Sequence, residues 1–217
     1  SYDDLRVMDN ASSSMKKQAG TYTDLMFNYG FQSDKRDRAF QPTSGYSAFF
    51  GQGLPVFSDA AYIQNTFSFS NYTEITPDII GAVKFFTTFV DGIDEDVRLS
   101  KRVQLPPARM RGFARNQIGP KDGNDHVGGN RAMALNLEAA LPNFLPQASN
   151  TDVALFLDAG NVWGVDYDSS IDDSNKIRSA FGIAASYLSP IGPLSFTFSQ
   201  DISKASTDAT ESFNFSL

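Results

Sequence analysis

Apolar side chains recur at every second position along most of this chain, which is the period of a β-strand and not of a helix. In residues 23–31 the odd positions include Leu25, Phe27 and Phe31, whereas the positions between them are mostly polar or small. Residues 131–141 repeat the pattern, with leucines on one face and small or polar side chains on the other. Each such stretch predicts a strand with one apolar face and one small or polar face.

This alternation, with turn signals between the stretches, predicts about nine strands. Their approximate ranges are 21–34, 44–53, 60–72, 77–92, 128–141, 151–160, 177–189, 193–202 and 210–217. Residues 1–8 fit the tail of a further strand. Residues 12–19 predict at most one turn of helix, because they carry no apolar stripe. We therefore expect an all-β chain.

The links between the predicted strands differ in length. Long polar links lie near 101–126 and 161–176, and shorter ones near 142–150 and 189–193. Long loops at one end and short turns at the other are typical of a transmembrane β-barrel, whose apolar face meets lipid. A soluble β-sandwich or a lipocalin-like barrel alternates as well, but its solvent face should be charged. Here the second face is rich in Ser, Thr, Asn, Gly and Ala, which favours an antiparallel transmembrane β-barrel.

Composition narrows the classes of protein further. Hydrophobic residues make up 41% of the chain, yet 19 residues are Phe, as expected for rings spread over a lipid-facing surface. A net charge of -7 argues against a nucleic-acid partner. The absence of cysteine excludes a disulfide, a thiolate metal site and a cysteine nucleophile. No apolar run approaches the roughly 20 residues of a membrane-spanning helix.

The remaining titratable residues do not indicate a metal site or a cofactor site. His126 is the only histidine and has no second ligand near it in the sequence. The acidic stretch 166–173 lacks the glycine and terminal glutamate of an EF-hand loop, so we expect it to be a solvated surface loop. We predict no metal, no cofactor and no catalytic residue.

The longest loop carries the most informative charged residues. Within residues 105–120 there are three arginines, Arg109, Arg111 and Arg115, and no acid. Arg111 is followed by Gly112, which permits a tight backbone, and by Phe113, which favours burial. Each arginine alone fits a solvent-exposed position, but this arrangement predicts a loop that folds back into the barrel.

Two acids lie on the small or polar faces of their strands. By parity, Glu138 and Asp158 both point into the lumen. If the arginine loop enters the lumen, Arg111 can pair with one or both of them, because a guanidinium fork matches a carboxylate. Because burying an unpaired charge is costly, we expect these charged side chains to be paired with one another.

These residues belong to motifs that resemble the BamA-type outer-membrane assembly factor family, also called the bacterial surface antigen family. Met110-Arg111-Gly112-Phe113 resembles the Val-Arg-Gly-Phe loop motif of the family, with Met in place of the first Val. Further motifs, before and after this one, match in the family's order, and the resemblance covers nearly the whole chain. They are Asp34–Asp37, Pro42–Gly45, Ile118–Pro120, Gly128–Asn130, Phe156–Gly160, Asn161–Trp163 and Ser189–Leu194.

The resemblance implies a sixteen-stranded barrel, of which residues 1–217 would be the C-terminal part, from about the eighth strand onward. The early strands and the periplasmic POTRA repeats would then be absent from this sequence. Such a division would explain the odd strand count, because bacterial single-chain barrels have an even number of strands. The resemblance also implies that Arg111 braces the loop against Glu138 and Asp158.

The family resemblance implies that the protein folds and inserts β-barrel proteins into the bacterial outer membrane through a lateral gate between the first and last strands. Phe213, Phe215 and Leu217 would lie on the last strand, at one side of this gate. The expected partners are unfolded outer-membrane protein clients, accessory assembly lipoproteins and outer-membrane lipid, and no enzymatic activity is expected. A TamA-type assembly factor or a two-partner secretion transporter would share these features, and a passive porin is a further alternative.

Overall fold

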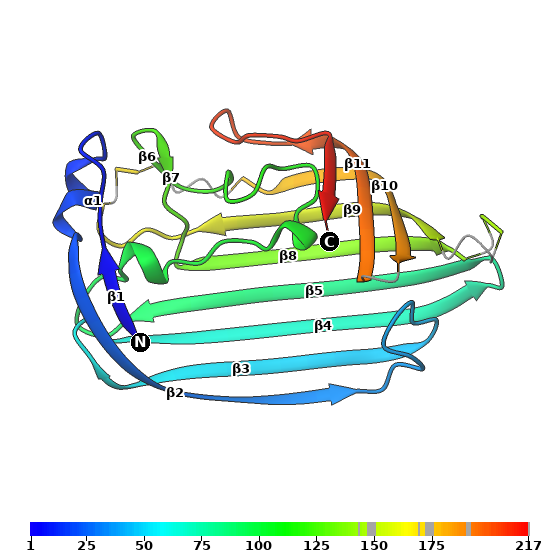
Figure 1. The fold of residues 1–217 in the computed structure, drawn as a ribbon, viewed down its shortest axis with the longest axis horizontal. Helices are drawn as coiled ribbons and strands as arrows, with labels where there is room; N and C mark the ends of the chain where they lie inside the picture. Colours follow the sequence, from blue (N-terminus) through cyan, green and yellow to red (C-terminus); the bar gives the residue numbers. More distant parts are fainter. Residues whose placement is uncertain (143, 147–150, 169, 172–175, 190–191, 217) are drawn as a thin grey trace.

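Ten strands pair with their neighbours in chain order and form one antiparallel sheet in the computed structural model (Figure 1). The structure describes residues 1–142, 144–146, 151–168, 170–171, 176–189 and 192–216. The strands of the sheet are β1 (Tyr2–Leu5), β2 (Gly20–Asp34), β3 (Gly45–Ser58), β4 (Tyr62–Thr76), β5 (Ile79–Gly92), β8 (Arg131–Leu141), β9 (Thr151–Trp163), β10 (Arg178–Ser189), β11 (Gly192–Ser203) and β12 (Phe213–Ser216).

Short elements lie outside this sheet, and most of them belong to the long connection between β5 and β8. They are α1 (Ser13–Lys17), η1 (Leu99–Lys101), η2 (Pro107–Arg109) and the small hairpin β6 (Lys121–Asp122) with β7 (Asp125–His126). No helix in the described part of the chain is long and apolar enough to cross a membrane.

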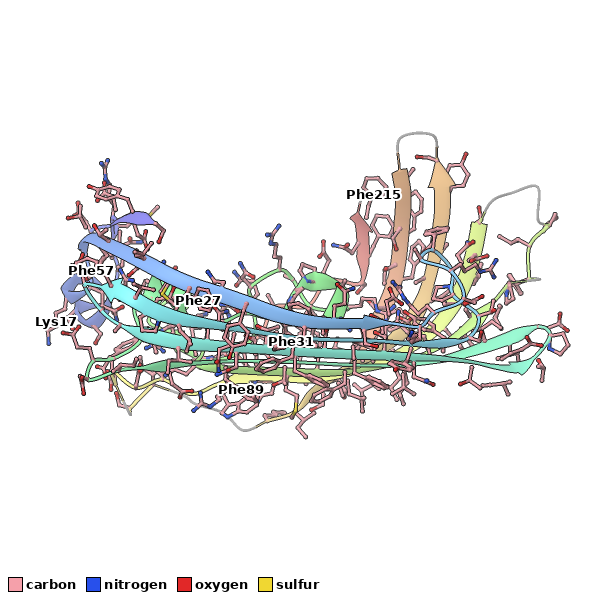
Figure 2. All side chains as sticks on the ribbon, turned by 90° about the horizontal axis from the view of Figure 1, so that it is seen from below. Lys17, Phe27, Phe31, Phe57, Phe89 and Phe215 are labelled. Atoms are coloured by element: carbon pink, nitrogen blue, oxygen red, sulfur yellow. The ribbon has the colours of Figure 1, made fainter. Side chains whose placement is uncertain are left out.

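The sheet is strongly curved and open. Figure 2 shows β10, β11 and β12 rising steeply from the level of the long strands β2 to β5. Within the described residues, β1 and β12 form the two edges and do not pair with each other. The connection between β5 and β8, residues 93–130, lies on the concave side of the sheet (Figure 1).

The apolar side chains cover the convex face, where they are exposed. One row crosses four neighbouring strands through Val83, Leu137, Leu157 and Phe181, which lie opposite one another in register and are all exposed. The intervening positions face inward and are buried, as at Ala132, Ala134, Asn136, Asp158 and Ala180. A soluble sandwich would bury the large side chains and expose the small ones, so this arrangement confirms the predicted transmembrane barrel fold.

The nine predicted strands are confirmed, with differences at their ends. The tail in residues 1–8 is β1, and the single helical turn is α1, which begins after its N-cap Ser12. β3 continues to Ser58, although residues 44–53 were expected. The register of β3 with β4 ends at Gly53, so Pro55 lies where no second neighbour needs its missing N–H.

The last strand is shorter than residues 210–217. β12 begins at Phe213 because residues 209–211 leave the sheet and bond to the loop between β5 and β8. The hairpin of β6 and β7 was not predicted, because two-residue strands leave no periodic signal. Its turn contains Gly123, whose φ is +62°.

The orientation of the apolar face predicts how the barrel responds to a charge. Replacing Leu137, near the middle of β8, with Arg should lower the free energy of unfolding in a bilayer by about 2–4 kcal/mol, since a lipid-facing guanidinium is poorly solvated. The Leu137→Met variant conserves volume and should change it by less than about 1.5 kcal/mol. Denaturant titration of the full-length protein in lipid vesicles measures both. Equal effects of Arg and Met would contradict a lipid-facing Leu137.

Candidate functional site

Residues 93–130 pack onto the concave face of the sheet through a small apolar core. Four buried side chains of this loop are Val103, Leu105, Met110 and Phe113. They contact a wall of small residues, namely Ala132, Ala134, Val162 and Ala180. Small side chains on the inner face leave room for the loop. The alternation of large and small side chains along each strand therefore places large groups toward lipid and also creates the surface on which the loop packs.

Arg111 binds the inner wall of the barrel through Asp158 of β9. Its Nε donates to Asp158 Oδ2 and its Nη2 donates to Oδ1, each at 2.7 Å. The backbone N–H of Arg111 also donates to Oδ2, at 3.1 Å. The Asp158 side chain is fully buried. This bidentate geometry is the strongest form of an arginine–carboxylate contact.

A second carboxylate and a second cation complete the cluster. Arg111 Nη2 lies 2.9 Å from Glu138 Oε1, and Glu138 Oε2 accepts a hydrogen bond from Lys84 of β5. The guanidinium also lies over the ring of Phe156, 3.8 Å from its centroid. Two cations therefore balance two anions in a largely buried space, in which Asp158 is fully covered.

The electrostatics of the cluster favour the charged guanidinium. Burial opposes the charge of Arg111, but hydrogen bonds and attraction from Asp158 and Glu138 outweigh this effect and raise its pKa above the ordinary value. Among the described residues, no carboxylate forms an ion pair with the neighbouring Arg109, and burial lowers the pKa of Arg109. The Arg109 carbonyl instead accepts a hydrogen bond from Asn136 Nδ2, at 2.9 Å. Arg115 is exposed.

Gly112 occupies a position that other residues do not tolerate well. Its φ is +90°, and an added Cβ would lie 2.8 Å from Cβ of Ala180 on β10. The next residue, Phe113, is buried and forms an isolated antiparallel bridge with Thr210. Three successive residues thus hold the loop in different ways. Arg111 forms ion pairs, Gly112 allows the backbone to approach β10 closely, and Phe113 is a buried apolar anchor.

The loop motif is also bonded to the segment that leads into the last strand. Glu211 N donates to Gly112 O at 3.0 Å, Ala114 N donates to Ala209 O at 3.0 Å, and Ala209 N donates to Gln117 O at 3.1 Å. These bonds join residues 112–117 to residues 209–211, and we call them the backbone ladder. Sequence reasoning missed the ladder, because every residue carries the same backbone groups.

A second buried ion cluster, which sequence reasoning also missed, ties the loop to β2. Arg98 Nη2 contacts both carboxylate oxygens of Asp24, at 2.6 and 2.7 Å, and Lys101 Nζ lies 3.1 Å from Asp24. Arg98 also stacks on Tyr22, 4.3 Å from the ring centroid. Asp24 sits on the polar face of its strand, so the parity argument applied to Glu138 would have found it.

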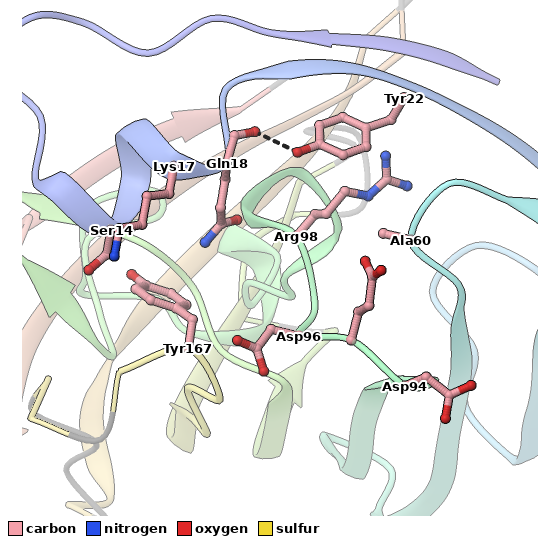
Figure 3. A pocket seen from close by; sticks show the side chains of 10 residues that line it. Ser14, Lys17, Gln18, Tyr22, Ala60, Asp94, Asp96, Arg98 and Tyr167 are labelled. Atoms are coloured by element: carbon pink, nitrogen blue, oxygen red, sulfur yellow. Dashed lines mark hydrogen bonds between the residues drawn. The ribbon is translucent and has the colours of Figure 1, made fainter.

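Beside this cluster lies a polar recess of about 580 Å³ between α1 and the start of the loop (Figure 3). Lys17, Tyr22, Asp96 and Arg98 line it, and Tyr22 Oη donates to the Gln18 carbonyl at 2.9 Å. Within the described residues, no group of three or more His, Cys, Asp or Glu side chains could hold a metal ion.

A third ion pair involves the acidic stretch 166–173, of which residues 169, 172 and 173 lie outside the described residues. Asp166 is exposed, as expected for a surface loop, and it also pairs with Arg102 and accepts hydrogen bonds from Val97 N at 2.8 Å and Asn130 Nδ2 at 2.9 Å. Burial alone would raise the pKa of Asp166, but these donors lower it below its ordinary value. The composition of the stretch is that of an exposed loop, and only the fold brings it to Arg102.

The predicted gate residues lie on β12 at the edge of the sheet. Phe213 and Phe215 are exposed on the convex face, and their rings pack against rings of β11 at a tilt. The ring centroids are 5.0 Å apart for Phe213 and Phe198 and 5.1 Å apart for Phe215 and Phe196. Leu217 lies outside the described residues.

The exposed apolar belt, the buried inner wall and the anchored loop define the wall of a transmembrane β-barrel that holds a loop in its lumen. The chain belongs to the Omp85 superfamily, since the model of the Omp85 superfamily domain matches residues 1–217. Membership confirms the resemblance drawn from the motifs and the predicted location in the bacterial outer membrane.

Three curated relatives are similar to most of this chain. Outer membrane protein assembly factor BamA of Neorickettsia risticii is 26% identical over 97% of this chain, and BamA of Neisseria meningitidis serogroup B is 24% identical over 87%. A SAM50-like protein of Schizosaccharomyces pombe is 24% identical over 93%. The matched regions are 29%, 28% and 45% of these three relatives.

A solved structure shares the fold in detail. The crystal structure of BamA from Haemophilus ducreyi lacking POTRA domains 1–3 superposes with a TM-score of 0.86 and is 26% identical. The match covers 99% of this chain and 48% of that chain. This chain therefore spans about half of the solved BamA chain and less than a third of the two curated BamA relatives.

The geometry at Gly112 predicts a steric effect on stability. Gly112→Ala combines a positive φ with a Cβ contact at 2.8 Å and should lower the unfolding free energy of the full-length protein by about 1–3 kcal/mol. Gly123→Ala is the matched control, because φ is +62° there but nothing lies within 4 Å of the new Cβ. Adding Ala180→Gly to Gly112→Ala should recover part of the loss. Equal losses at both glycines would contradict the close approach to β10.

Proposed function

We propose that this chain forms the wall, the lumen loop and the gate edge of a barrel that folds and inserts other β-barrel proteins into the outer membrane. Membership of the Omp85 superfamily and similarity to two assembly factors support the proposal. The observation that carries it is the double attachment of the loop. Arg111 binds the wall at Asp158 and Glu138, and the adjoining residues 112–117 bond to the segment before β12.

The edge of β12 is suited to receive another strand. Ser199 N donates to Ser212 O, and the register pairs Asn214 with Thr197. Because bonding alternates along an antiparallel pair, even-numbered residues of β12 bond to β11. The N–H and C=O groups of Phe213 and Phe215 then point to the other edge. A client strand can add to this edge through backbone hydrogen bonds, and its outward side chains then meet lipid.

The proposed mechanism involves strand exchange and no covalent chemistry, so the protein would not be an enzyme. A lateral gate would open between the first strand of the complete barrel and β12. Unfolded outer-membrane proteins would be the clients, and accessory assembly lipoproteins would act with the full protein. The convex belt of Phe and Leu side chains would contact outer-membrane lipid.

Two related functions differ in the fate of the client. A TamA-type factor would use the same edge, whereas a two-partner secretion transporter would pass a polypeptide across the membrane. The number of POTRA repeats in the full reading frame distinguishes these from a BamA-type factor. A passive porin is disfavoured, because residues 93–130 occupy the concave face and anchor there through three ion clusters.

The first functional prediction reverses the central charge. Arg111→Glu places a third acid beside Asp158 and Glu138, so it should detach the loop and reduce client insertion by the full-length protein at least roughly tenfold. Arg115→Glu is the matched control, because Arg115 lies in the same loop but is exposed. The assay is the rate at which a β-barrel client becomes folded, followed by its heat-dependent gel mobility, in vesicles that contain each variant.

A charge swap tests whether the contact with the wall is direct. Arg111→Glu combined with Asp158→Arg should restore more activity than either single change, since it recreates an opposite pair at this position. Normal client insertion by the Arg111→Glu protein would contradict the role of the cluster in assembly.

The second functional prediction concerns the free edge. Phe215→Pro removes the N–H that would bond to a client but none that bonds to β11, so the barrel should fold while client insertion slows. Phe215→Ala keeps the N–H and controls for the lost ring. Asn214→Pro removes a bond to β11 and should also reduce barrel stability. Identical insertion rates for Phe215→Pro and Phe215→Ala would sink the backbone-pairing mechanism.

A further inference from the structure

The connection between β11 and β12, residues 204–212, turns inward instead of projecting as a free hairpin loop. In Figure 1 its orange-red trace runs back over the long loop before it returns to β12. Ala205 is buried, and the Asp208 side chain is completely covered. His126 Nε2 lies 3.1 Å from the Thr207 carbonyl oxygen, which places the connection against the hairpin of β6 and β7.

Asp208 is held by Arg178 at the start of β10. Arg178 Nε and Nη2 donate to the two carboxylate oxygens of Asp208, at 2.9 and 3.0 Å. Arg178 Nη1 donates to Asn161 Oδ1 and to the Lys176 carbonyl. Both charged side chains are at most 1% exposed. A buried pair with bidentate geometry and further hydrogen bonds has a strongly preferred arrangement.

The same carboxylate also closes a turn in its own segment. Ala205 N donates to Asp208 Oδ2 at 2.6 Å, and Asp208 N donates to Ala205 O at 3.2 Å. The residue after Asp208 is Ala209, where the backbone ladder to residues 112–117 begins. Asp208 is therefore fixed by side-chain bonds immediately before the chain is fixed by backbone bonds.

Together with the backbone ladder and the contact of His126 with Thr207, this anchor keeps the pairing of β12 short. β11 has twelve residues, but its register with β12 covers only Ser195 to Phe198. An unanchored segment 204–212 is free to continue along the edge of β11, as in an ordinary hairpin. The ladder to the lumen loop would then be lost.

We propose that Arg178 and Asp208 are a positioning pair, which holds residues 209–211 on the lumen loop and so sets where β12 begins. This inference rests on the proposed function, because the part of it that concerns assembly requires β12 to be the gate edge. The pair contacts no client. It acts through the ladder, and it couples the Arg111 cluster to the strand on which a client would pair.

The test uses amide hydrogen exchange of the full-length protein in lipid nanodiscs. Asp208→Ala should speed exchange about tenfold in peptides that cover residues 108–117 and 204–216, because the ladder opens more often. Peptides that cover β4 should be unchanged. The matched control is Asp201→Ala, which breaks the more exposed pair between Asp201, near the end of β11, and Lys204, at 3.3 Å.

A second variant guards against failure to fold. Asp208→Ala leaves the Arg178 charge buried and unpaired, which is strongly destabilising, whereas Arg178→Met with Asp208→Leu removes both charges. The double variant should insert into membranes and still show the faster exchange in both regions. Arg178→Asp with Asp208→Arg should restore slow exchange at least in part.

The outcomes separate the anchor from the function. Unchanged exchange in residues 108–117 of the inserted double variant would overturn the anchor. Faster exchange with a normal rate of client insertion would overturn the coupling to assembly. Faster exchange with insertion slowed at least severalfold supports both. A wild-type protein that inserts no client would contradict the proposed function and the coupling, while exchange alone would still decide the anchor.

Discussion

The contact between Arg111 and the carboxylate of Asp158 is the point on which the interior of this barrel depends. The convex face is apolar, so the concave face has few large side chains with which to hold a loop of nearly forty residues. Buried charged side chains hold the loop instead. They need oppositely charged partners, because burying an isolated charge costs too much free energy. Arg111 satisfies Asp158 and shares Glu138 with Lys84. Direct contacts of Arg111 therefore fix the position of the loop relative to two strands, β8 and β9.

Three ion clusters attach the loop to the sheet at separate points along its length. Arg98 reaches Asp24 near one edge of the sheet, Arg102 reaches Asp166 beyond β9, and Arg111 reaches the middle of the wall. Directional contacts of this kind specify position, whereas the alanine-rich seat beneath Met110 and Phe113 supplies burial without much specificity. The ion clusters and the apolar packing together hold residues 93–130 firmly against the barrel wall.

Parity explains how much could be predicted from the amino-acid sequence. Successive side chains of a strand alternate between faces, so Glu138 and Asp158 could be assigned to the interior before any fold was known. The same rule places Asp24 of β2 in the interior, where it binds Arg98. Asp166 is exposed, as the composition of its loop predicts, but its pairing with Arg102 could not be predicted, because composition does not determine which residues a loop meets. The backbone ladder could not be predicted at all, since it uses groups that every residue has.

The position of the ladder next to β12 has a consequence for insertions and deletions. Only one residue, Ser212, separates Glu211 of the ladder from Phe213 of the last strand. Adding or removing a single residue here would reverse the faces of β12, turning Phe213 and Phe215 toward the lumen and Asn214 toward lipid. The spacing between ladder and strand is therefore constrained in length far more than in residue type, in contrast to an ordinary surface loop, where insertions are readily accepted.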